Sequence, residues 1–412
     1  MIISGMSGNE IYCLSLKGLA PGEITVGNSV QSLGFAGSLG SSFQSLAGGE
    51  IQNITQLISA GRHAAIGRME EEARRHNAVG VTGVTSELKT LAGYTEFLSQ
   101  GTAVHAQQQP AHFFTTAASG TELYCHLDAG YQPMKFVMGN VAYALGIGRG
   151  LMGSLRTMAQ GEVQEYSQMY NGIRHLALRR LQEEAAAIGA NAVVDVNVEM
   201  LPFGVGTVEL LMTGTASFHP HLAQGQIQPH QVVTSELTGE ELWNLAKLGY
   251  APVQLVMATS VYSLGVVGGI GTMFASMSRG ELPQVTQLIY KARENCLELI
   301  RREAQAVGAE RVIGNKLIIR ELMPGMIEVV AIGTAIRPMA NMTPATPNLI
   351  TQAVIVDRDT LQLGNVMPAM PAYGAGMPMR TGAGSALGCL IAAAVTALTI
   401  GGSLLAAFLS HN

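Results

Sequence analysis

Histidines are the residues in this sequence whose spacing comes closest to a metal site, because imidazole nitrogens bind zinc, copper or nickel. Five of them fall in two short stretches: His105, His112, His219, His221 and His230. These stretches, roughly 105–118 and 218–237, are rich in Gln, His, Pro and Ala, a composition typical of linkers. We therefore interpret the five residues as linker histidines and predict neither a bound metal nor another cofactor.

The other reactive side chains lack the partners that catalysis requires. The sequence contains neither a G-x-S-x-G elbow nor a phosphate-binding P-loop. His63 and His175 each follow an arginine, but the third copy has Glu294 in that column, and no nucleophile recurs at a fixed spacing from the histidines. The cysteines are far apart and form no C-x-x-C pair, which argues against a structural zinc cluster: Cys13, Cys125, Cys296 and Cys389. We expect a protein that is not an enzyme.

The composition describes an apolar chain with little charge. Its 412 residues correspond to about three domains. Hydrophobic residues make up 48% and charged residues only 13%, which excludes intrinsic disorder. The net charge is −5 and no run of Lys or Arg occurs, so a nucleic-acid partner is not expected. The low charge favours a protein with much buried or membrane-facing surface.

Three copies of one unit organise the chain. Offsets of 112 and then 119 residues align three segments, about 8–104, 119–217 and 238–337. The recurring columns include Gly8/Gly120/Gly239, Glu10/Glu122/Glu241, Gly49/Gly161/Gly280, Arg62/Arg174/Arg293 and Glu72/Glu184/Glu303. Each copy is near 100 residues long, far longer than a solenoid repeat, so each copy should be a domain with its own core.

Each copy reads as strand, helix, strand, strand, which is an α+β domain. The first strand is followed by a Gly-rich segment and then by a long helix. In the third copy, Pro283 marks the first turn of that helix. Glu50 and its equivalents would then lie near the N-terminus of the helix, where a carboxylate interacts favourably with the helix dipole. A 3.6-residue apolar rhythm runs along the helix in the first copy: Ile54, Ile58, Ala65, Met69 and Ala73.

These motifs resemble the YbjQ-like family, small bacterial domains that carry a heavy-metal-binding label. The resemblance rests on residues 174–181, the run from Glu184 to Val194, the terminal Gly-Thr-Ala, and the Gly-Gly-Glu at 48–50. It covers all three copies and implies ring-like pentamers. It also leaves open a metal-handling role, although no ligands can be assigned from these motifs.

Two charged columns are candidates for an oligomer interface: Arg62, Arg174 and Arg293, with Glu72, Glu184 and Glu303. Within one helix the arginine and the glutamate are ten residues apart, too far for an i,i+4 pair. One interpretation is a solvated helix edge. The other is pairing with a neighbouring domain or chain, where the forked guanidinium suits a carboxylate.

The C-terminal segment 383–410 is predicted to be a transmembrane tail anchor. It has no charged residue and is long enough to span a bilayer. Its apolar residues include Leu387, Leu390, Ile391, Val395, Leu398, Ile400, Leu404, Leu405, Phe408 and Leu409. Residues 338–382, rich in Pro, Met and Gly, would be a spacer. Residues 255–278 are also uncharged, but the aligned copies are polar there, so we expect a strand and a Gly-rich packing surface.

These expectations combine into a non-enzymatic, membrane-anchored assembly protein. Its three domains would form a ring or cage, each domain in its own ring or all three in shared rings. The anchor and Arg380 on its flank place the bulk of the chain on the cytoplasmic side, most simply of a bacterial inner membrane. The partners are then further copies of the chain and the lipid bilayer. The alternative is a heavy-metal-binding membrane protein.

Overall fold

The computed structural model describes residues 1–31, 49–91, 94–106, 112–144, 161–203, 207–264, 283–323 and 325–349. All of them belong to one compact unit, Met1–Ala353. The predicted anchor 383–410 and the predicted spacer beyond residue 349 lie outside the described residues. Among the helices that are described, none is both long and apolar enough to cross a membrane.

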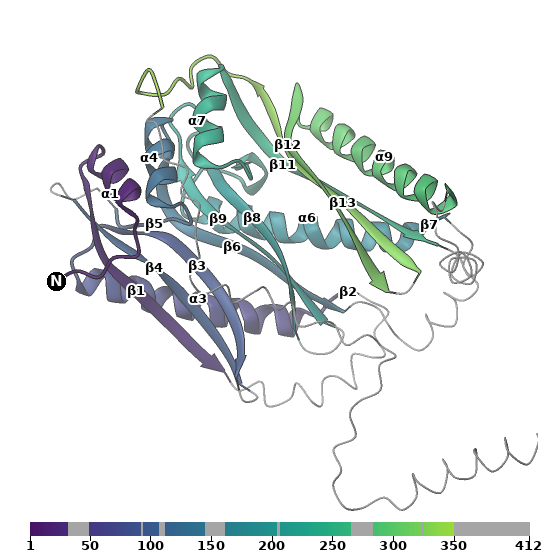
Figure 1. Ribbon diagram of the computed structural model, residues 1–412, viewed down its shortest axis with the longest axis horizontal. Coiled ribbons are helices and arrows are strands. Elements are labelled where there is room, and N and C mark those ends of the chain that lie inside the picture. The colour runs from purple at the N-terminus through teal and green to yellow at the C-terminus, as the bar shows by residue number, and fades with distance from the viewer. Residues whose placement is uncertain are drawn as a thin grey trace, which may run out of the picture. The chain divides into compact units, whose positions relative to one another are not determined.

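Three copies of one α+β arrangement make up the unit, as the sequence predicted (Figure 1). Repeat 1 contains α1 (Gly8–Ser15), β1 (Leu19–Gln31), β2 (Gly49–Glu50), α3 (Gln52–Arg75), β3 (Gly80–Leu91) and β4 (Tyr94–Ala106). Repeat 2 contains β5 (Phe114–Thr115), α4 (Gly120–Asp128), β6 (Gln132–Ala144), β7 (Gly161–Glu162), α6 (Gln164–Ala187), β8 (Ala192–Pro202) and β9 (Thr207–Phe218). Repeat 3 follows a short 3-10 turn, η1 (Pro229–Gln231), and contains β10 (Val233–Thr234), α7 (Gly239–Lys247), β11 (Tyr250–Ser263), α9 (Pro283–Ala306), β12 (Arg311–Met323) and β13 (Met326–Pro338).

A short helix that the sequence pattern did not predict opens each repeat. The Glu10/Glu122/Glu241 column forms its capping boxes, with Ser7, Ser119 and Thr238 as the N-caps. Glu10 also accepts a hydrogen bond from the backbone N–H of Gly120 through its second oxygen, over 3.0 Å. Glu10 therefore both caps its own helix and contacts the start of the next one.

The long helix packs one apolar face on its sheet. Ile58, Ala65, Met69 and Ala73 of α3 are buried, which confirms most of the predicted stripe. The helix begins at Gln52, two residues after Glu50. Glu50 lies instead in the two-residue strand β2, so its predicted role at the helix dipole is wrong.

Each sheet borrows a short strand from a neighbouring repeat. In repeat 2 the order is β10-β8-β9-β6-β2. Its outer members come from repeat 3 (β10, parallel to β8) and repeat 1 (β2, antiparallel to β6). Sheets 1 and 3 have four strands, in the orders β1-β4-β3-β5 and β12-β13-β11-β7, so each has a borrowed strand on one side only.

The apolar cores run across the repeat boundaries. One cluster joins Ile66 and Met69 of α3 to Phe136 and Met138 of β6. A larger one joins α6 and β8 of repeat 2 to residues of β11 and β13 in repeat 3, including Leu255. The expectation that each domain has a core of its own is therefore corrected: neighbouring repeats complete each other's cores.

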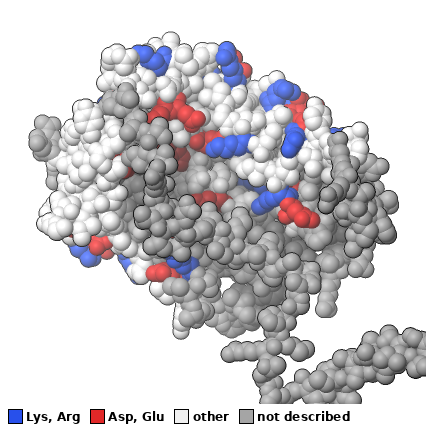
Figure 2. All heavy atoms as spheres, in the orientation of Figure 1, with Lys and Arg blue, Asp and Glu red and all other residues white. Residues whose placement is uncertain are grey.

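Charged side chains on the face shown in Figure 2 are scattered between wide uncharged areas.

The first residues of the predicted spacer lie against the repeats. The N–H of Met339 donates to the carbonyl of Gly249 over 2.7 Å, and Met342 is buried. The backbone N–H and hydroxyl of Thr346 both donate to Asp128. Residues 339–349 thus belong to the packed unit.

Candidate functional site: the junctions between repeats

Arg62 of α3 is buried at the first junction and pairs with repeat 2. Its Nη2 lies 2.7 Å from Oε2 of Glu209 on β9, and its Nε donates to Oε1 over 3.0 Å. Its Nη1 donates to the carbonyl and hydroxyl of Ser86 on β3. Neither member of the ion pair has exposed side-chain surface. Such a two-point contact offsets the cost of removing both charges from water and fixes the orientation of the two repeats.

Arg174 has the same position on α6 and pairs with repeat 3. Its Nη2 donates to Oε1 of Glu328 on β13 over 2.8 Å. Its Nη1 contacts the hydroxyl of Thr259 on β11, and Arg320 of β12 binds the second oxygen of Glu328. Both junctions therefore join an arginine of the long helix to a glutamate on the last strand of the following repeat.

The predicted glutamate column lies at the same junctions, with a different partner. Oε2 of Glu184 accepts from the N–H of Met138, and its Oε1 lies 3.0 Å from Nε2 of His63 in repeat 1. Glu303 repeats the arrangement, 3.1 Å from Nε2 of His175 in repeat 2. The hydrogen bond to each glutamate raises the pKa of its histidine. These histidines are half-exposed, so they contribute a screened surface pair to each junction.

The Gly-Glu pairs before α3 and α6 also bond to the next repeat. Oε1 of Glu50 accepts from Nη1 of Arg180 over 2.7 Å. Oε2 of Glu162 accepts from the amide of Asn295 on α9 over 3.0 Å. The backbone N–H of Ile51 extends this contact by donating to the carbonyl of Ala142. A segment that the sequence assigned to a helix terminus is therefore part of the junction.

Asp128, at the end of α4, connects all three repeats. It lies 2.6 Å from Nζ of Lys17 in repeat 1 and accepts from the indole N–H of Trp243 in repeat 3 over 2.7 Å. Burial opposes its charged form, but the bonds from Lys17, Thr346 and Trp243 outweigh burial and lower the pKa of Asp128. The single tryptophan of the chain is thus held by a carboxylate that contacts all three repeats.

The structure separates the predicted interface residues into two groups. Arg62 and Arg174 pair with a neighbouring repeat, whereas Arg293 is exposed and has no ion pair with any residue that the structure describes. Glu72 accepts from the N–H of Val26 in its own repeat. The solvated-edge interpretation is therefore wrong for the first two arginines. Contacts between chains remain a prediction.

Sequence reasoning missed the glutamates that neutralise the arginines. Glu209 and Glu328 share an alignment column with Glu96, five residues before the Gly-Thr-Ala motif in each copy. Recurrence of an acidic residue in the same strand of every copy was the available indication. The apolar residues around it in the strand obscure this signal.

The linker prediction is wrong for His105, which lies in strand β4, and the predicted linker residue His219 does not fit a metal site. His219 is buried, and both ring nitrogens are engaged: Nε2 lies 3.1 Å from the carbonyl of Ala129, and Nδ1 lies 3.2 Å from the N–H of His221. Burial lowers the pKa of His219. Burial also raises the pKa of the Cys296 thiol to about 11, which disfavours a metal-binding thiolate. Within the described part of the chain, no group of three His, Cys, Asp or Glu residues is placed to hold an ion.

One buried acid–base pair is unique to repeat 2. Nε2 of His126 lies 3.4 Å from Oδ1 of Asp195, and His126 is completely buried. Asp195 has a left-handed backbone with φ of 53°. Burial opposes the charged imidazole, but the carboxylate of Asp195 outweighs it and the pKa of His126 is raised. The other repeats have leucine and glycine in these columns: Leu14 and Gly83 in repeat 1, Leu245 and Gly314 in repeat 3.

Comparison with known sequences identifies the family. The model of the YbjQ family, described as "Putative heavy-metal-binding", matches residues 20–107, 130–219 and 249–338. The chain belongs to the YbjQ family. Each match covers the first strand, long helix and last two strands of one repeat, so the three YbjQ units coincide with the three sheets.

Relatives of this YbjQ-family chain include single-domain and longer proteins. An encapsulin nanocompartment protein of Mycobacterium tuberculosis is 29% identical over 242 residues, 58% of this chain and 90% of the relative. UPF0145 proteins of Methanoregula boonei and Vibrio campbellii are 42% and 39% identical over 83 and 80 residues. These matches cover 20% and 19% of this chain and 69% and 77% of the relatives. No solved structure matches the chain.

Proposed function

We propose that this YbjQ-family chain is a non-enzymatic assembly protein that builds a ring- or shell-like homo-oligomer from its repeats. The observation that carries the proposal is the repeated junction, in which a buried arginine of one repeat meets a buried glutamate of the next. In such a contact the planar guanidinium binds one carboxylate in a fixed orientation, and a specific interface between subunits requires contacts of this kind. The similarity to an encapsulin nanocompartment protein over more than half of the chain supports a shell-like product.

The particle mass of the full-length protein in a mild non-ionic detergent tests this proposal. Light scattering and electron microscopy should show particles of defined size that contain several copies of the 43.3 kDa chain. A single mass near 43.3 kDa at micromolar concentration would contradict it. Fivefold symmetry remains a prediction that the same images test.

Membrane attachment is a second element of the proposal. The uncharged segment 383–410 would hold the assembly at the cytoplasmic face of a bacterial inner membrane, with the lipid bilayer as its second partner. The length and composition of this segment support the proposal.

A metal-handling role is the competing function, because the family description names heavy metals. Elemental analysis of protein purified without a His-tag distinguishes the two. An assembly protein should contain metal well below one ion per chain and should keep its melting temperature in a chelator, since a structural site contributes folding free energy directly. Stoichiometric metal with a large loss of melting temperature would favour the competing role.

A further inference from the structure

The two outer repeats each expose the half of a junction that repeat 2 has buried. Repeat 2 lies between repeats 1 and 3 (Figure 1), and its sheet receives a strand on both edges. In sheet 1 no strand of another described segment pairs with the outer edge of β1. In sheet 3 no described strand pairs with the outer edge of β12. We call the first surface the head and the second the tail.

The head is defined by the outward side of β1. Ile24, Val26 and Val30 are exposed by 44%, 45% and 58%. Their equivalents in the other repeats are all buried at the junctions: Phe136, Met138 and Ala142 in β6, and Leu255, Met257 and Val261 in β11. The head therefore presents three apolar side chains where the other repeats receive the preceding long helix.

The charged part of the head is already arranged as at the inner junctions. Glu96, half-buried on β4, accepts from the amide of Asn28 over 3.2 Å. In repeat 2 the equivalent Asn140 amide lies 3.3 Å from Glu209, the glutamate that binds Arg62. Lys89 lies opposite Glu96 in the sheet, but its ammonium forms its ion pair with Glu87, over 2.8 Å. The head thus holds a positioned carboxylate without its arginine.

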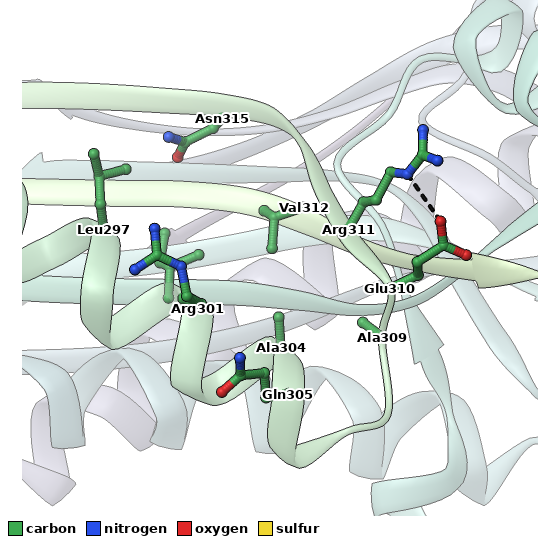
Figure 3. A pocket seen from close by; sticks show the side chains of 10 residues that line it. Leu297, Arg301, Ala304, Gln305, Ala309, Glu310, Arg311, Val312 and Asn315 are labelled. Atoms are coloured by element: carbon green, nitrogen blue, oxygen red, sulfur yellow. Dashed lines mark hydrogen bonds and ion pairs between the residues drawn. The ribbon is translucent and has the colours of Figure 1, made fainter.

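The tail is a groove between α9 and β12. It has a volume of about 400 Å³, and its walls include Leu297, Ala304 and Arg301 on the helix and Val312 and Asn315 on the strand (Figure 3). In repeats 1 and 2 the residues equivalent to Leu297 and Val312 are buried beneath the first strand of the next repeat: Ile66 and Val81, then Leu178 and Val193. The groove is the space that such a strand would fill.

The polar groups of the tail are exposed in the same pattern. Arg293 is exposed, whereas Arg62 and Arg174 are buried. Thr286 is exposed, whereas its equivalents Thr55 and Ser167 are buried and accept from backbone N–H groups of the next repeat. Every group needed for a third junction is present, half at the tail and half at the head.

We propose that the tail of one chain binds the head of a second copy and reproduces the inner junctions. Arg293 would pair with Glu96, and Ile24 and Val26 would enter the groove between α9 and β12. The hydroxyl of Thr286 would accept from the N–H of Val30. The proposal rests on the proposed assembly function and names the surface that carries it. Its support is continuity: two copies of this interface already exist within the chain.

The N-terminal residues complete the head. The N–H of Ile24 donates to the carbonyl of Ile3 over 3.1 Å. In the other repeats the equivalent N–H groups donate to the hydroxyls of Thr115 in β5 and Thr234 in β10, the strands that pair with the preceding sheet. Ile3 is 68% exposed. Its equivalents Thr115 and Thr234 pair as strand residues with Val81 and Val193, so Ile3 would pair in the same way with Val312 of the neighbouring copy.

One column makes the contact between chains weaker than the inner junctions. Repeat 3 has Glu294 where repeats 1 and 2 have His63 and His175. In the assembled junction Glu294 would face Glu72, the equivalent of Glu184 and Glu303. Two facing carboxylates repel, so assembly should require a higher concentration than it would with a histidine at position 294. The substitution Glu294→His should restore the inner pattern and tighten assembly.

A head-to-tail contact joins two different surfaces and therefore forms a closed ring or an open helical array. A closed ring of whole chains contains a number of repeats divisible by three. Fivefold symmetry would then require five whole chains in one ring, because five single repeats cannot be divided among complete chains.

The experiment uses full-length protein in mild detergent and two blocking variants. Arg293→Glu blocks the tail, and Val26→Glu blocks the head by placing a carboxylate where Met138 and Met257 are buried. Each variant alone should raise the concentration for half-assembly by roughly a hundredfold, as expected for an unpaired buried charge. Both sites are exposed in the single chain, so its melting temperature should not change. Arg302→Glu is the matched control, because its equivalents Glu71 and Glu183 are exposed in every repeat.

Mixing the two blocked variants gives the sharpest test. Each has one intact end, so an equal mixture should form dimers of twice 43.3 kDa, although neither variant does so alone. Large particles that tolerate both substitutions would overturn the head-to-tail contact while leaving the proposed assembly function intact. A monomeric wild-type chain would overturn both. Failure of the mixture to dimerise, or no tightening by Glu294→His, would also contradict the proposal.

Discussion

At the scale of single residues, buried charge determines how the repeats are joined. Arg62 and Glu209 are fully buried, and each depends on the other for compensation of its charge. Removing one partner from such a pair is costly, whereas replacing both by apolar side chains is often neutral. The pair should therefore contribute to specificity of the junction more than to stability.

Arg62→Met should lower the free energy of unfolding by about 3–5 kcal/mol, because Glu209 is left buried and unpaired. The double variant Arg62→Met/Glu209→Leu should recover most of this loss. Urea unfolding followed by Trp243 fluorescence measures both. Arg75→Met is the control: Arg75 is 75% exposed, and its pair with Glu71 should contribute about 0–1 kcal/mol. Equal losses in the single and double variants would show that the pair is not coupled.

The buried pair of His126 and Asp195 should make repeat 2 sensitive to pH. Folding raises the pKa of His126 above its unfolded value of 6.5. The charged imidazole therefore stabilises the folded state fully at a pH below 6.5, and this contribution is lost as pH rises through the pKa of His126 in the folded state. The double variant His126→Leu/Asp195→Gly introduces the leucine and glycine that the other repeats have in these columns. Glycine at position 195 also relieves the strain of a non-glycine residue with φ of 53°, about 1–2 kcal/mol. In thermal unfolding between pH 5 and pH 9, the melting temperature of the double variant relative to that of wild type should increase as pH rises. Parallel pH profiles would contradict this prediction.

At the scale of elements, each long helix is fitted to its sheet by complementary side-chain sizes. A Cβ at Gly61 of α3 would come within 2.3 Å of the Phe97 ring on β4. The same two columns hold Ile173 and Leu210 in repeat 2 and Ala292 and Val329 in repeat 3. The smallest of the three helix residues, Gly61, therefore accompanies the largest of the three strand residues, Phe97, because the separation of helix and sheet is fixed by close packing.

Gly61→Ala should destabilise the protein by about 1–3 kcal/mol through overpacking against Phe97. Adding Phe97→Val reproduces the pair of repeat 3 and should recover part of the loss. Gly67→Ala on the same helix is the control, since a Cβ there meets nothing within 4 Å and should be neutral or slightly stabilising. Thermal unfolding compares the three variants. A loss of equal size for both glycines would indicate a general effect of the helix and not contact with Phe97.

At the scale of the whole molecule, the described unit packs as one body through shared cores and exchanged strands. Separating the repeats would expose Phe136, Met138 and Leu255, so a single repeat cut from the chain should be less stable than the three together. The inner junctions join repeats of one covalent chain, whereas the proposed contact between chains would depend on concentration. This difference would allow one kind of surface to serve both in folding and in assembly.

Deletion of residues 383–412 should move the protein from the membrane fraction to the soluble fraction without changing its particle size. The physical reason is that the packed unit ends before this segment, at Ala353, and that head and tail both lie within it. Fractionation with a carbonate wash followed by light scattering checks both parts. Truncated protein that still sediments with membranes would show that the anchor lies elsewhere.

The sequence by itself determined the number of repeats, because the three copies align with one another. It also determined the α+β class and the apolar stripe of the long helix, because these depend on local periodicity, but it did not show the short helix that opens each repeat. It also singled out Arg62 and Arg174 as conspicuous, since their own helix offers no partner. Only the tertiary structure decided that their partners are Glu209 and Glu328, that short strands cross between sheets, and that Arg293 is left exposed. These facts depend on which segments meet in space, and strand exchange between repeats leaves no local periodicity in the sequence.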